Sequence, residues 1–268
     1  MPPLLGGRLE GLPPPFLAKL CGSPLERIQS KFSSCTLELP FTSEEDTVDA
    51  ILLAAGRSTR LGSGIDKQLY RIDNKPLVIY SAEQLLAHND IDRLVVVGSA
   101  EGMDDIQSVF REFDLIQSCE FVLGGDERQE SVRNSLAAVD SERVLLHEGA
   151  RPLITLSLID RVLSPDTACV SPTLPVPFTV AIGGKNMEQE LDRSSLHNIQ
   201  LPQAFDRQKL FEAHEQASLE EFTATDDSAL IFRMGYSVEF VEGEVTNIKV
   251  TYPTDLILVE KILKGQAP

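Results

Sequence analysis

The feature that most constrains this chain is an alternation of short apolar runs with segments of helical spacing. The first run, from Val48 to Ala55, is typical of a buried strand, and it ends at Gly56. Apolar side chains then recur with helical spacing at 77–88, and a second apolar run follows at 93–98. The pattern continues beyond residue 165. It predicts an α/β fold in which a mostly parallel, twisted sheet carries helices on both faces.

The remaining expected elements are equally short. We expect further strands at 121–123, at 144–147 and from 168 onwards, and helices at 103–113, around 132–139 and around 158–162. Sheets of this kind bind ligands beyond the carboxyl ends of their strands. The chemistry is therefore expected in the segments that directly follow strands.

Residues 1–47 have a different character, with the run Pro13-Pro14-Pro15 and no strong periodicity. We interpret them as an N-terminal extension that is disordered or loosely packed, and we expect residues 48–268 to form one domain. The extension lacks the long apolar segment of a secretory signal, so a cytoplasmic protein is expected. The alternative is a plastid protein in which residues 1–47 are a transit peptide.

Charge and hydropathy argue against two classes of function. The formal net charge is −17, whereas proteins that bind nucleic acid need a basic face. No stretch approaches the roughly 20 apolar residues of a membrane-spanning helix. We therefore expect neither a nucleic-acid partner nor a membrane. The cysteines lack metal-ligand spacing and are interpreted as free thiols; they are Cys21, Cys35, Cys119 and Cys169.

The loop after the first strand has the properties of a phosphate site. Ala54, Ala55 and Gly56 are small, so backbone N–H groups can approach phosphate oxygens closely. Arg60 and Lys67 follow, and two cations suit a nucleoside triphosphate with about four negative charges. The loop matches neither a Walker loop nor the G-x-G-x-x-G fingerprint. The alternative is an ordinary turn with two solvated cations.

The strand at 121–123 leads into a glycine pair. Gly124 and Gly125 would let a flat base approach the backbone, and the Ser131 hydroxyl could read the edge of that base. The alternative is a glycine turn in which Asp126 caps the next helix.

Two further segments carry candidate polar groups. Glu148 and Arg151 follow the strand at 144–147, and the carboxylate could hold a substrate hydroxyl or a metal-bound water. The alternative is a surface ion pair between them, and His147 is interpreted as structural. Residues 247–251 are interpreted as a strand with one inward-facing lysine, Lys249, for which a phosphate would be a partner. The alternative there is a lysine that protects an edge strand.

Together these segments resemble the 2-C-methyl-D-erythritol 4-phosphate cytidylyltransferase family from about Val48 to Lys264. The motifs that carry the resemblance are Leu53-Ala54-Ala55-Gly56, Gly124-Gly125-Asp126-Glu127-Arg128, Ala150-Arg151-Pro152, Leu201-Pro202-Gln203, Thr225-Asp226-Asp227-Ser228-Ala229 and Asn247-Ile248-Lys249-Val250-Thr251.

The resemblance implies a Rossmann-like nucleotidyltransferase with a protruding β-arm at about 176–200 and a homodimeric assembly. It implies transfer of CMP from CTP to 2-C-methyl-D-erythritol 4-phosphate with release of pyrophosphate, a step of non-mevalonate isoprenoid precursor synthesis. CTP and a sugar-alcohol phosphate are the implied partners, and Mg²⁺ is the implied cofactor. Three alternatives stay open: ribitol 5-phosphate or another pentitol phosphate as acceptor, transfer of another base, and a non-catalytic nucleotide-binding paralogue.

The resemblance also implies roles for individual residues. The catalytic cations would be Arg60, Lys67 and Lys249. The substrate-binding residues would be Ala54, Ala55, Gly56, Gly125, Asp126, Ser131, Glu148, Arg151, Thr179 and Arg193. No protein residue is implied as a metal ligand.

Three departures from the family's pattern lie on the acceptor side or near the metal. Glu148 replaces a shorter carboxylate, and Thr246 stands where an acidic residue is common. The loop at 178–181 keeps Thr179 but lacks the flanking Asp and Lys of the family. Because Thr179 and Arg193 are both retained, the resemblance favours methylerythritol phosphate over a pentitol phosphate.

Overall fold

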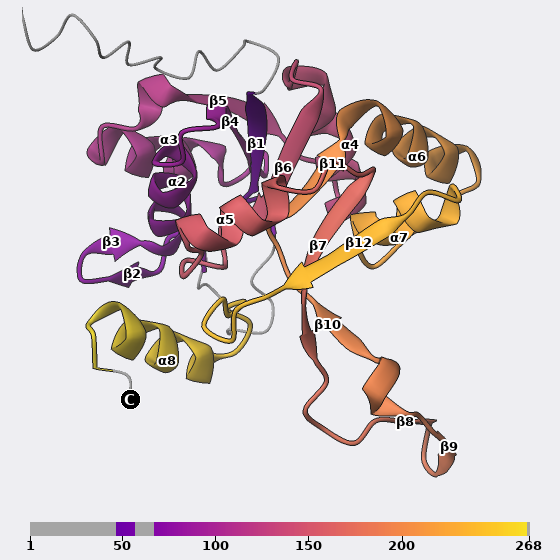
Figure 1. The fold of residues 1–268 in the computed structure, drawn as a ribbon. Coiled ribbons are helices and arrows are strands. Elements are labelled where there is room, and N and C mark those ends of the chain that lie inside the picture. Colours follow the sequence, from indigo (N-terminus) through magenta and orange to yellow (C-terminus); the bar gives the residue numbers. More distant parts are fainter. Residues whose placement is uncertain (1–46, 57–66, 267–268) are drawn as a thin grey trace, which may run out of the picture. The chain divides into compact units, whose positions relative to one another are not determined.

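The computed structural model describes residues 47–56 and 67–266, which contain an eight-stranded sheet (Figure 1). The strand order is β10 (His197–Ile199), β7 (Cys169–Pro175), β11 (Gln203–Asp206), β6 (Arg143–Glu148), β1 (Val48–Leu53), β4 (Ile91–Gly98) and β5 (Cys119–Leu123), and β12 (Val238–Glu242) also pairs with β7. The pairs among β6, β1, β4 and β5 are parallel, as is β12 with β7, whereas β10 and β11 are antiparallel to their neighbours. The predicted mostly parallel sheet is confirmed.

Helices cover both faces of the sheet because successive strand residues point to opposite faces. Ala50 and Leu52 of β1 share one apolar core with α2 (Leu77–Leu86), α3 (Met103–Glu112) and α5 (Leu156–Leu163). Ile51 and Leu53 share the other with α4 (Arg128–Ser135), α6 (Arg207–Leu219) and α7 (Asp227–Arg233). The sheet therefore lies between two helical layers, which hold the loops at its carboxyl edge in place.

The first strand differs from its prediction in length and in content. It ends at Leu53, and Asp49 interrupts the apolar run while being 1% exposed. Its Oδ2 accepts hydrogen bonds from the backbone N–H groups of Asp140 at 2.6 Å and Ser141 at 3.1 Å. These bonds explain why a carboxylate is tolerated in a central strand, since a buried charge needs polar partners.

The predicted strand at 247–251 is wrong. β12 ends at Glu242, and residues 243–252 form no strand or helix. Local hydrogen bonds turn the chain instead: the N–H of Asn247 donates to the Glu244 carbonyl at 3.0 Å and that of Ile248 to the Thr246 carbonyl at 2.7 Å. The alternation of apolar and polar residues imitated a strand where the backbone is bent.

A third, smaller apolar cluster packs α8 (Pro253–Leu263) against the rest of the domain. Leu256 and Val259 of α8 join Leu77, Leu153, Val250 and Ile72, the last of which lies in the hairpin of β2 (Arg71–Ile72) and β3 (Lys75–Pro76). Val250 directly follows Lys249, and the hairpin begins four residues after Lys67. The cluster therefore links the chain segments that carry these two lysines.

The predicted arm lies between β7 and β11. β10 pairs with the end of β7, from Ile199 opposite Thr173 to His197 opposite Pro175. Between β7 and β10 in the sequence, β8 (Ala181–Gly183) and β9 (Met187–Glu190) form a two-stranded hairpin in which every residue is exposed. Figure 1 shows this hairpin projecting away from the sheet.

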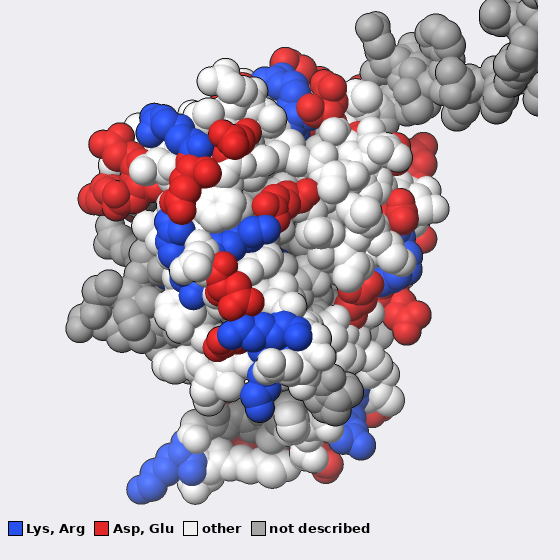
Figure 2. All heavy atoms as spheres, turned by 90° about the vertical axis from the view of Figure 1, so that its left-hand side faces the viewer, with Lys and Arg blue, Asp and Glu red and all other residues white. Residues whose placement is uncertain are grey.

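The surface carries closely mixed charges. Figure 2 shows acidic and basic side chains interspersed on one face. Surface ion pairs include Lys75 of β3 with Glu83 of α2 at 2.6 Å, and Lys264 with Glu260 of α8 at 2.6 Å. Within residues 47–56 and 67–266, no helix is both long and apolar enough to cross a membrane. Cys119 and Cys169, the two cysteines in these ranges, are free thiols as predicted.

Candidate active site

A cleft of about 820 Å³ opens at the carboxyl ends of β1, β4, β5 and β6. The ends of these strands and the loops that follow them supply most of its lining, as expected for a parallel α/β sheet. Lys67 and Gln68 border the cleft from the segment before β2, and Lys249 borders it from the segment after β12. Segments far apart in the sequence therefore meet here.

One wall of the cleft is built from glycine. The N–H of Gly125 donates to Ser131 Oγ at 3.1 Å, and that hydroxyl donates to the Glu127 carbonyl at 3.1 Å. A Cβ atom on Gly124 would lie 2.6 Å from Ser131 Oγ, and one on Gly125 would lie 2.2 Å from Glu130 Cγ. Any larger residue would displace this wall, so the backbone stays open to a flat ligand group.

Asp126 stands exposed at the edge of the same wall. It does not cap α4, because the N-cap position belongs to Glu127. Its N–H donates instead to Glu130 Oε2 at 2.9 Å. The alternative interpretation of this turn as a helix cap made by Asp126 is therefore wrong.

The carboxylate of Glu148 lies among three cations at the end of β6. Its Oε1 accepts from Lys249 Nζ at 2.8 Å, and its Oε2 accepts from Arg151 Nε at 3.3 Å. Arg128 Nε lies 3.7 Å from Oε1. Glu148 is 7% exposed and Arg151 is 8% exposed, so the Glu148–Arg151 pair exists but is buried, not on the surface.

These cations fix the ionisation of Glu148. Burial would raise the pKa of the carboxyl, but Lys249, Arg151 and Arg128 outweigh burial and lower the pKa of Glu148 to about 2. The group is therefore an anion at neutral pH. Cations surround this one carboxylate, and Lys249 and Arg128 also line the cleft, so an anionic ligand can meet positive charge at this end of it. The other charged side chains of the lining are mostly acidic.

The segment that carries Lys249 is fixed to the end of β6. The N–H of Val250 donates to the Ala150 carbonyl at 2.8 Å, and Arg151 Nη1 donates to the Asn247 carbonyl at 2.9 Å. The Lys249 side chain is 38% exposed, so it is not the inward-facing lysine that the sequence predicts. The ammonium group can reach both Glu148 and a ligand in the cleft.

The buried ring of His147 contacts the backbone of the turn that carries Arg151. It is fully buried, and burial lowers the pKa of His147 to about 4, so the ring is neutral at physiological pH. Its Nε2 lies 3.1 Å from the Arg151 carbonyl and donates to it. The ring holds the turn after β6, which agrees with its predicted structural role.

The structure gathers the strand-end candidates and separates those of the arm. The predicted residues that line the cleft are Ala55, Gly56, Lys67, Gly125, Asp126, Ser131, Glu148 and Lys249. Ala54 and Arg151 are buried next to this group. Thr179 and Arg193 are exposed on the arm and do not line the cleft of their own chain. Arg60 lies outside the described residues.

Three residues to which the sequence assigns no role are connected to the cleft: Arg128 lines it, and Asp227 and His214 lie buried behind Arg128. Arg128 Nη1 is 2.6 Å from Asp227 Oδ2, and Asp227 Oδ1 is 3.1 Å from His214 Nε2. Asp227 and His214 are each 1% exposed. The available signal was the acidic pair Asp226-Asp227 at a helix start, because one carboxylate can cap the helix while the next falls on its buried face and needs a partner.

The side chains of the cleft fit a metal ion that is held mainly by substrate and not by the protein. Within residues 47–56 and 67–266, no three metal-binding side chains come together. Both oxygens of Glu148 already contact cations. Mg²⁺ is usually held by one or two carboxylates together with substrate phosphates and water. The arrangement therefore fits a Mg²⁺ ion that arrives on the phosphates of a nucleotide, and it assigns no protein ligand.

Fold and cleft together define a class of protein. A cleft with a glycine wall and two lysines, placed beyond the carboxyl ends of a parallel sheet, is typical of a Rossmann-like protein that binds a phosphorylated ligand. The comparisons with known proteins then give the particular family.

The chain matches the model of the 2-C-methyl-D-erythritol 4-phosphate cytidylyltransferase family (IspD) over residues 48–265. Proteins of that name from Caldanaerobacter subterraneus and Bacillus velezensis are 37% and 35% identical to it, over 81% of this chain and 99% and 96% of theirs. The crystal structure of 4-diphosphocytidyl-2C-methyl-D-erythritol synthase from Anaerococcus prevotii is 27% identical with a TM-score of 0.72, and the match covers 82% of this chain and 97% of that one. The chain belongs to this family of cytidylyltransferases.

Proposed function

We propose that this protein transfers CMP from CTP to 2-C-methyl-D-erythritol 4-phosphate and releases pyrophosphate. The observation that carries the proposal is the placement of Lys67 and Lys249 on the same cleft as the glycine wall. Two anionic substrates repel each other, so a site that joins them needs cations near both. The glycine wall would receive the base, while the lysines would face the phosphates.

The reaction is an in-line displacement at phosphorus. A phosphate oxygen of the acceptor forms a bond to the α-phosphorus of CTP, the bond from that phosphorus to the bridging oxygen breaks, and its electron pair leaves with pyrophosphate. Lys67, Lys249 and Arg60 would offset the charge that builds on the non-bridging oxygens. Positioning and electrostatics carry such a reaction without a protein nucleophile.

Glu148 is an orienting group and not a base in this scheme. A carboxylate with a pKa of about 2 does not take up a proton at neutral pH. Its contacts at 2.8 Å with Lys249 and 3.3 Å with Arg151 hold these two cations at the end of β6. The acceptor phosphate is already ionised, so its attack needs no general base.

Mg²⁺ is the proposed cofactor. When bound to the triphosphate, it would screen the phosphate charges and favour departure of pyrophosphate. The cations of the cleft would act beside it, and Lys67 would contact triphosphate oxygens.

We further propose a homodimer in which the arm of one subunit reaches the cleft of the other. Thr179 and Arg193 are exposed and remote from the lining of their own cleft. The same arm exposes Phe178 at 76% and Met187 at 65%. Apolar side chains gathered on a projecting arm are expected to be covered by a partner.

The dimer proposal is tested with mixed subunits. A dimer of one Lys67→Ala chain and one Arg193→Ala chain would contain one intact site if the arm acts on the partner, so activity should return when the two inactive variants are refolded together. Mixed dimers, verified by affinity tags, that recover no activity would contradict the exchange.

Two proposals concern the remainder of the chain. Residues 1–47 are proposed to lie outside the catalytic domain, because the family match begins at residue 48 and β1 begins at Val48. The second proposal is a cytoplasmic location for the protein, which is supported by relatives that are bacterial proteins.

The acceptor is tested by measuring pyrophosphate release with CTP and either 2-C-methyl-D-erythritol 4-phosphate or ribitol 5-phosphate. We expect kcat/KM to be higher for methylerythritol phosphate. A higher kcat/KM for ribitol 5-phosphate would overturn the acceptor and keep the reaction, whereas no release with either acceptor would favour a non-catalytic nucleotide-binding protein. UTP and ATP in place of CTP test the choice of base.

A further inference from the structure

A line of five contacting side chains runs from the buried side of α6 to the cleft. It joins His214 of α6, Asp227 of α7, Arg128 of α4, Glu148 of β6 and finally Lys249. The successive closest contacts are 3.1, 2.6, 3.7 and 2.8 Å. From Asp227 onwards the charges alternate in sign, so each member attracts the next.

Burial strengthens the attraction between the Asp227 carboxylate and the Arg128 guanidinium. The carboxylate is 1% exposed, whereas the Arg128 side chain is 30% exposed and lines the cleft. Burial would raise the pKa of Asp227, but Arg128 and His214 outweigh burial and lower the pKa, so the group is ionised. A buried carboxylate 2.6 Å from a guanidinium nitrogen restricts that guanidinium to one place.

Arg128 lies between two carboxylates. Its Nη1 contacts Asp227, while its Nε faces Glu148 Oε1, the oxygen that also accepts from Lys249. Two cations therefore share one oxygen. If Arg128 moved away, Glu148 would be less neutralised and would hold Lys249 more tightly, at the expense of a ligand anion in the cleft.

We propose that Asp227 is a positioning residue for the acceptor side of the cleft: it holds Arg128 beside Glu148, and Arg128 keeps Lys249 available to the acceptor phosphate. The inference rests on the proposed function, because it takes the acceptor phosphate to be the anion that Lys249 meets. It adds Asp227 and Arg128 to the residues on which turnover depends.

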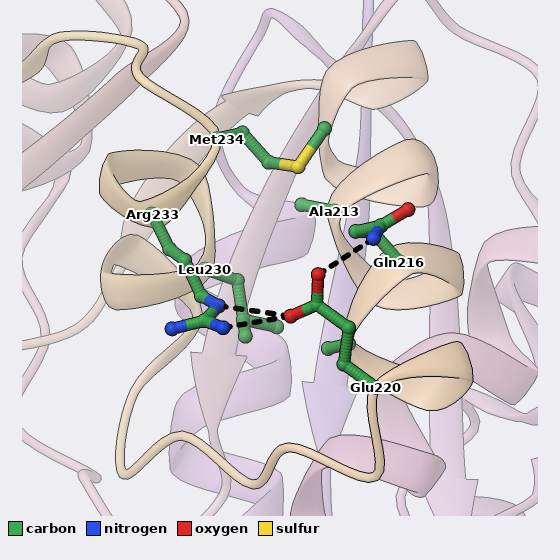
Figure 3. A pocket seen from close by; sticks show the side chains of 7 residues that line it. Ala213, Gln216, Glu220, Leu230, Arg233 and Met234 are labelled. Carbon is green, nitrogen blue, oxygen red and sulfur yellow. Dashed lines mark hydrogen bonds and ion pairs between the residues drawn. The ribbon is translucent and has the colours of Figure 1, made fainter.

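An ion pair that joins α6 to α7 away from the cleft provides a matched control. Figure 3 shows Glu220, which directly follows α6, bonded to Arg233 of α7 and to Gln216 of α6. Arg233 Nη2 donates to Glu220 Oε2 at 2.7 Å, and the Glu220 side chain is 37% exposed. These residues line a small separate pocket and do not line the cleft. The pair thus joins α6 to α7 without reaching the proposed site.

The first test is Asp227→Asn, which keeps the shape of the side chain and removes its charge. Because Arg128 then loses its fixed position, we expect kcat/KM for the acceptor to fall by about 10²-fold. The dissociation constant of CTP, measured by equilibrium binding, should stay near the wild-type value. Glu220→Gln should leave both quantities unchanged. A folded Asp227→Asn protein with wild-type kcat/KM overturns the proposal.

Asp227→Asn also leaves Arg128 next to a neutral partner and can destabilise the fold, so a second variant is needed. The double variant Arg128→Met/Asp227→Asn removes both charges, and thermal unfolding shows whether it is folded. A positioning role predicts that it loses as much kcat/KM as Arg128→Met alone, because Glu148 still lacks its second cation. Recovery of wild-type kcat/KM would show that the two charges merely neutralise each other inside the fold, and it would overturn the proposal.

An assay of the wild-type protein distinguishes failure of the proposed function from failure of the positioning role. If wild-type protein releases no pyrophosphate, the function is wrong, and the positioning role is then judged from a crystal structure of Asp227→Asn. A contact between Arg128 and Glu148 that remains at 3.7 Å in that structure would overturn the role. A displaced guanidinium would support it.

Discussion

The charges of single residues set the chemistry of the cleft. Glu148 is one carboxylate surrounded by Lys249, Arg151 and Arg128, and its pKa of about 2 follows from that surplus of cations. Such a group stays charged through any change of pH that a cell experiences. Its value to the site is therefore geometric, since it holds cations where a phosphate can meet them.

At the same scale, Lys67 is expected to matter for turnover and not for folding. Lys67→Ala removes a cation from the cleft lining, and the loss of one preorganised charge typically lowers kcat by about 10²-fold or more. The midpoint of thermal unfolding should change little, because the residue lies in a loop and not in an apolar core. Pyrophosphate release by the purified variant measures the effect. Turnover near the wild-type value would remove Lys67 from the mechanism.

The ionisation of Glu148 predicts how stability depends on pH. Its folded pKa of about 2 lies below the unfolded value of about 4.3, so the charged form stabilises the fold above the unfolded pKa. That contribution should be complete above about pH 5 and lost progressively as the pH falls toward 2. Urea unfolding of wild-type and Glu148→Gln protein between pH 7 and 3 tests this. The difference in free energy of unfolding should be constant from pH 7 to 5 and shrink below that; a difference that already shrinks between pH 7 and 6 would contradict the assignment.

At the scale of elements, sequence periodicity was sufficient for the first half of the sheet. The apolar runs of β1, β4 and β6 are buried on both faces, and burial on both faces is what a continuous apolar run signals. β5, at the edge of the sheet, is only partly buried. β11 was not predicted, because its four residues include Gln203 and Asp206, whose polar groups find partners in other segments. The segment at 247–251 was predicted wrongly, since its turn depends on carbonyls at Glu244 and Thr246 that periodicity does not describe.

Part of the site could be predicted from the sequence, and the long-range contacts behind it could not. Strand-end residues such as Gly125 and Glu148 were found because the sheet dictates where they meet. The contact of Arg128 with Asp227 joins the starts of two helices that are 99 positions apart in the numbering, and no local pattern reports such a distance. Long-range ion pairs of this kind become visible once the two helical layers are packed.

The arm carries a prediction about the acceptor. Arg193 is exposed on it, and a guanidinium makes two parallel contacts to a phosphate that an ammonium group cannot copy. Arg193→Lys should therefore raise KM for the sugar-alcohol phosphate and leave KM for CTP near the wild-type value. Steady-state kinetics with each substrate varied in turn measure both constants. Lys185→Ala, in the hairpin of the same arm, is the control and should change neither. An equal rise in both constants would argue that Arg193 acts on the fold of the arm.

For the whole molecule, the catalytic unit is expected to begin at the first strand. The family match covers residues 48–265. Within residues 47–56 and 67–266, the core clusters of the two helical layers and the lining of the cleft consist of residues from Val48 onwards. Deletion of residues 1–44 should therefore leave kcat and both KM values unchanged. Kinetics and size-exclusion chromatography of the shortened protein check this. An inactive or aggregated product would show that the extension contributes to the catalytic unit.

The reaction itself is tested most directly by following the α-phosphate of CTP. Wild-type protein is incubated with α-³²P-labelled CTP, Mg²⁺ and 2-C-methyl-D-erythritol 4-phosphate, and the products are separated and identified by mass spectrometry. The account predicts that the label appears in a cytidine diphosphate ester of the acceptor, with one unlabelled pyrophosphate released for each molecule formed. Label that stays in CTP, or that appears in free CMP without an acceptor product, would contradict it.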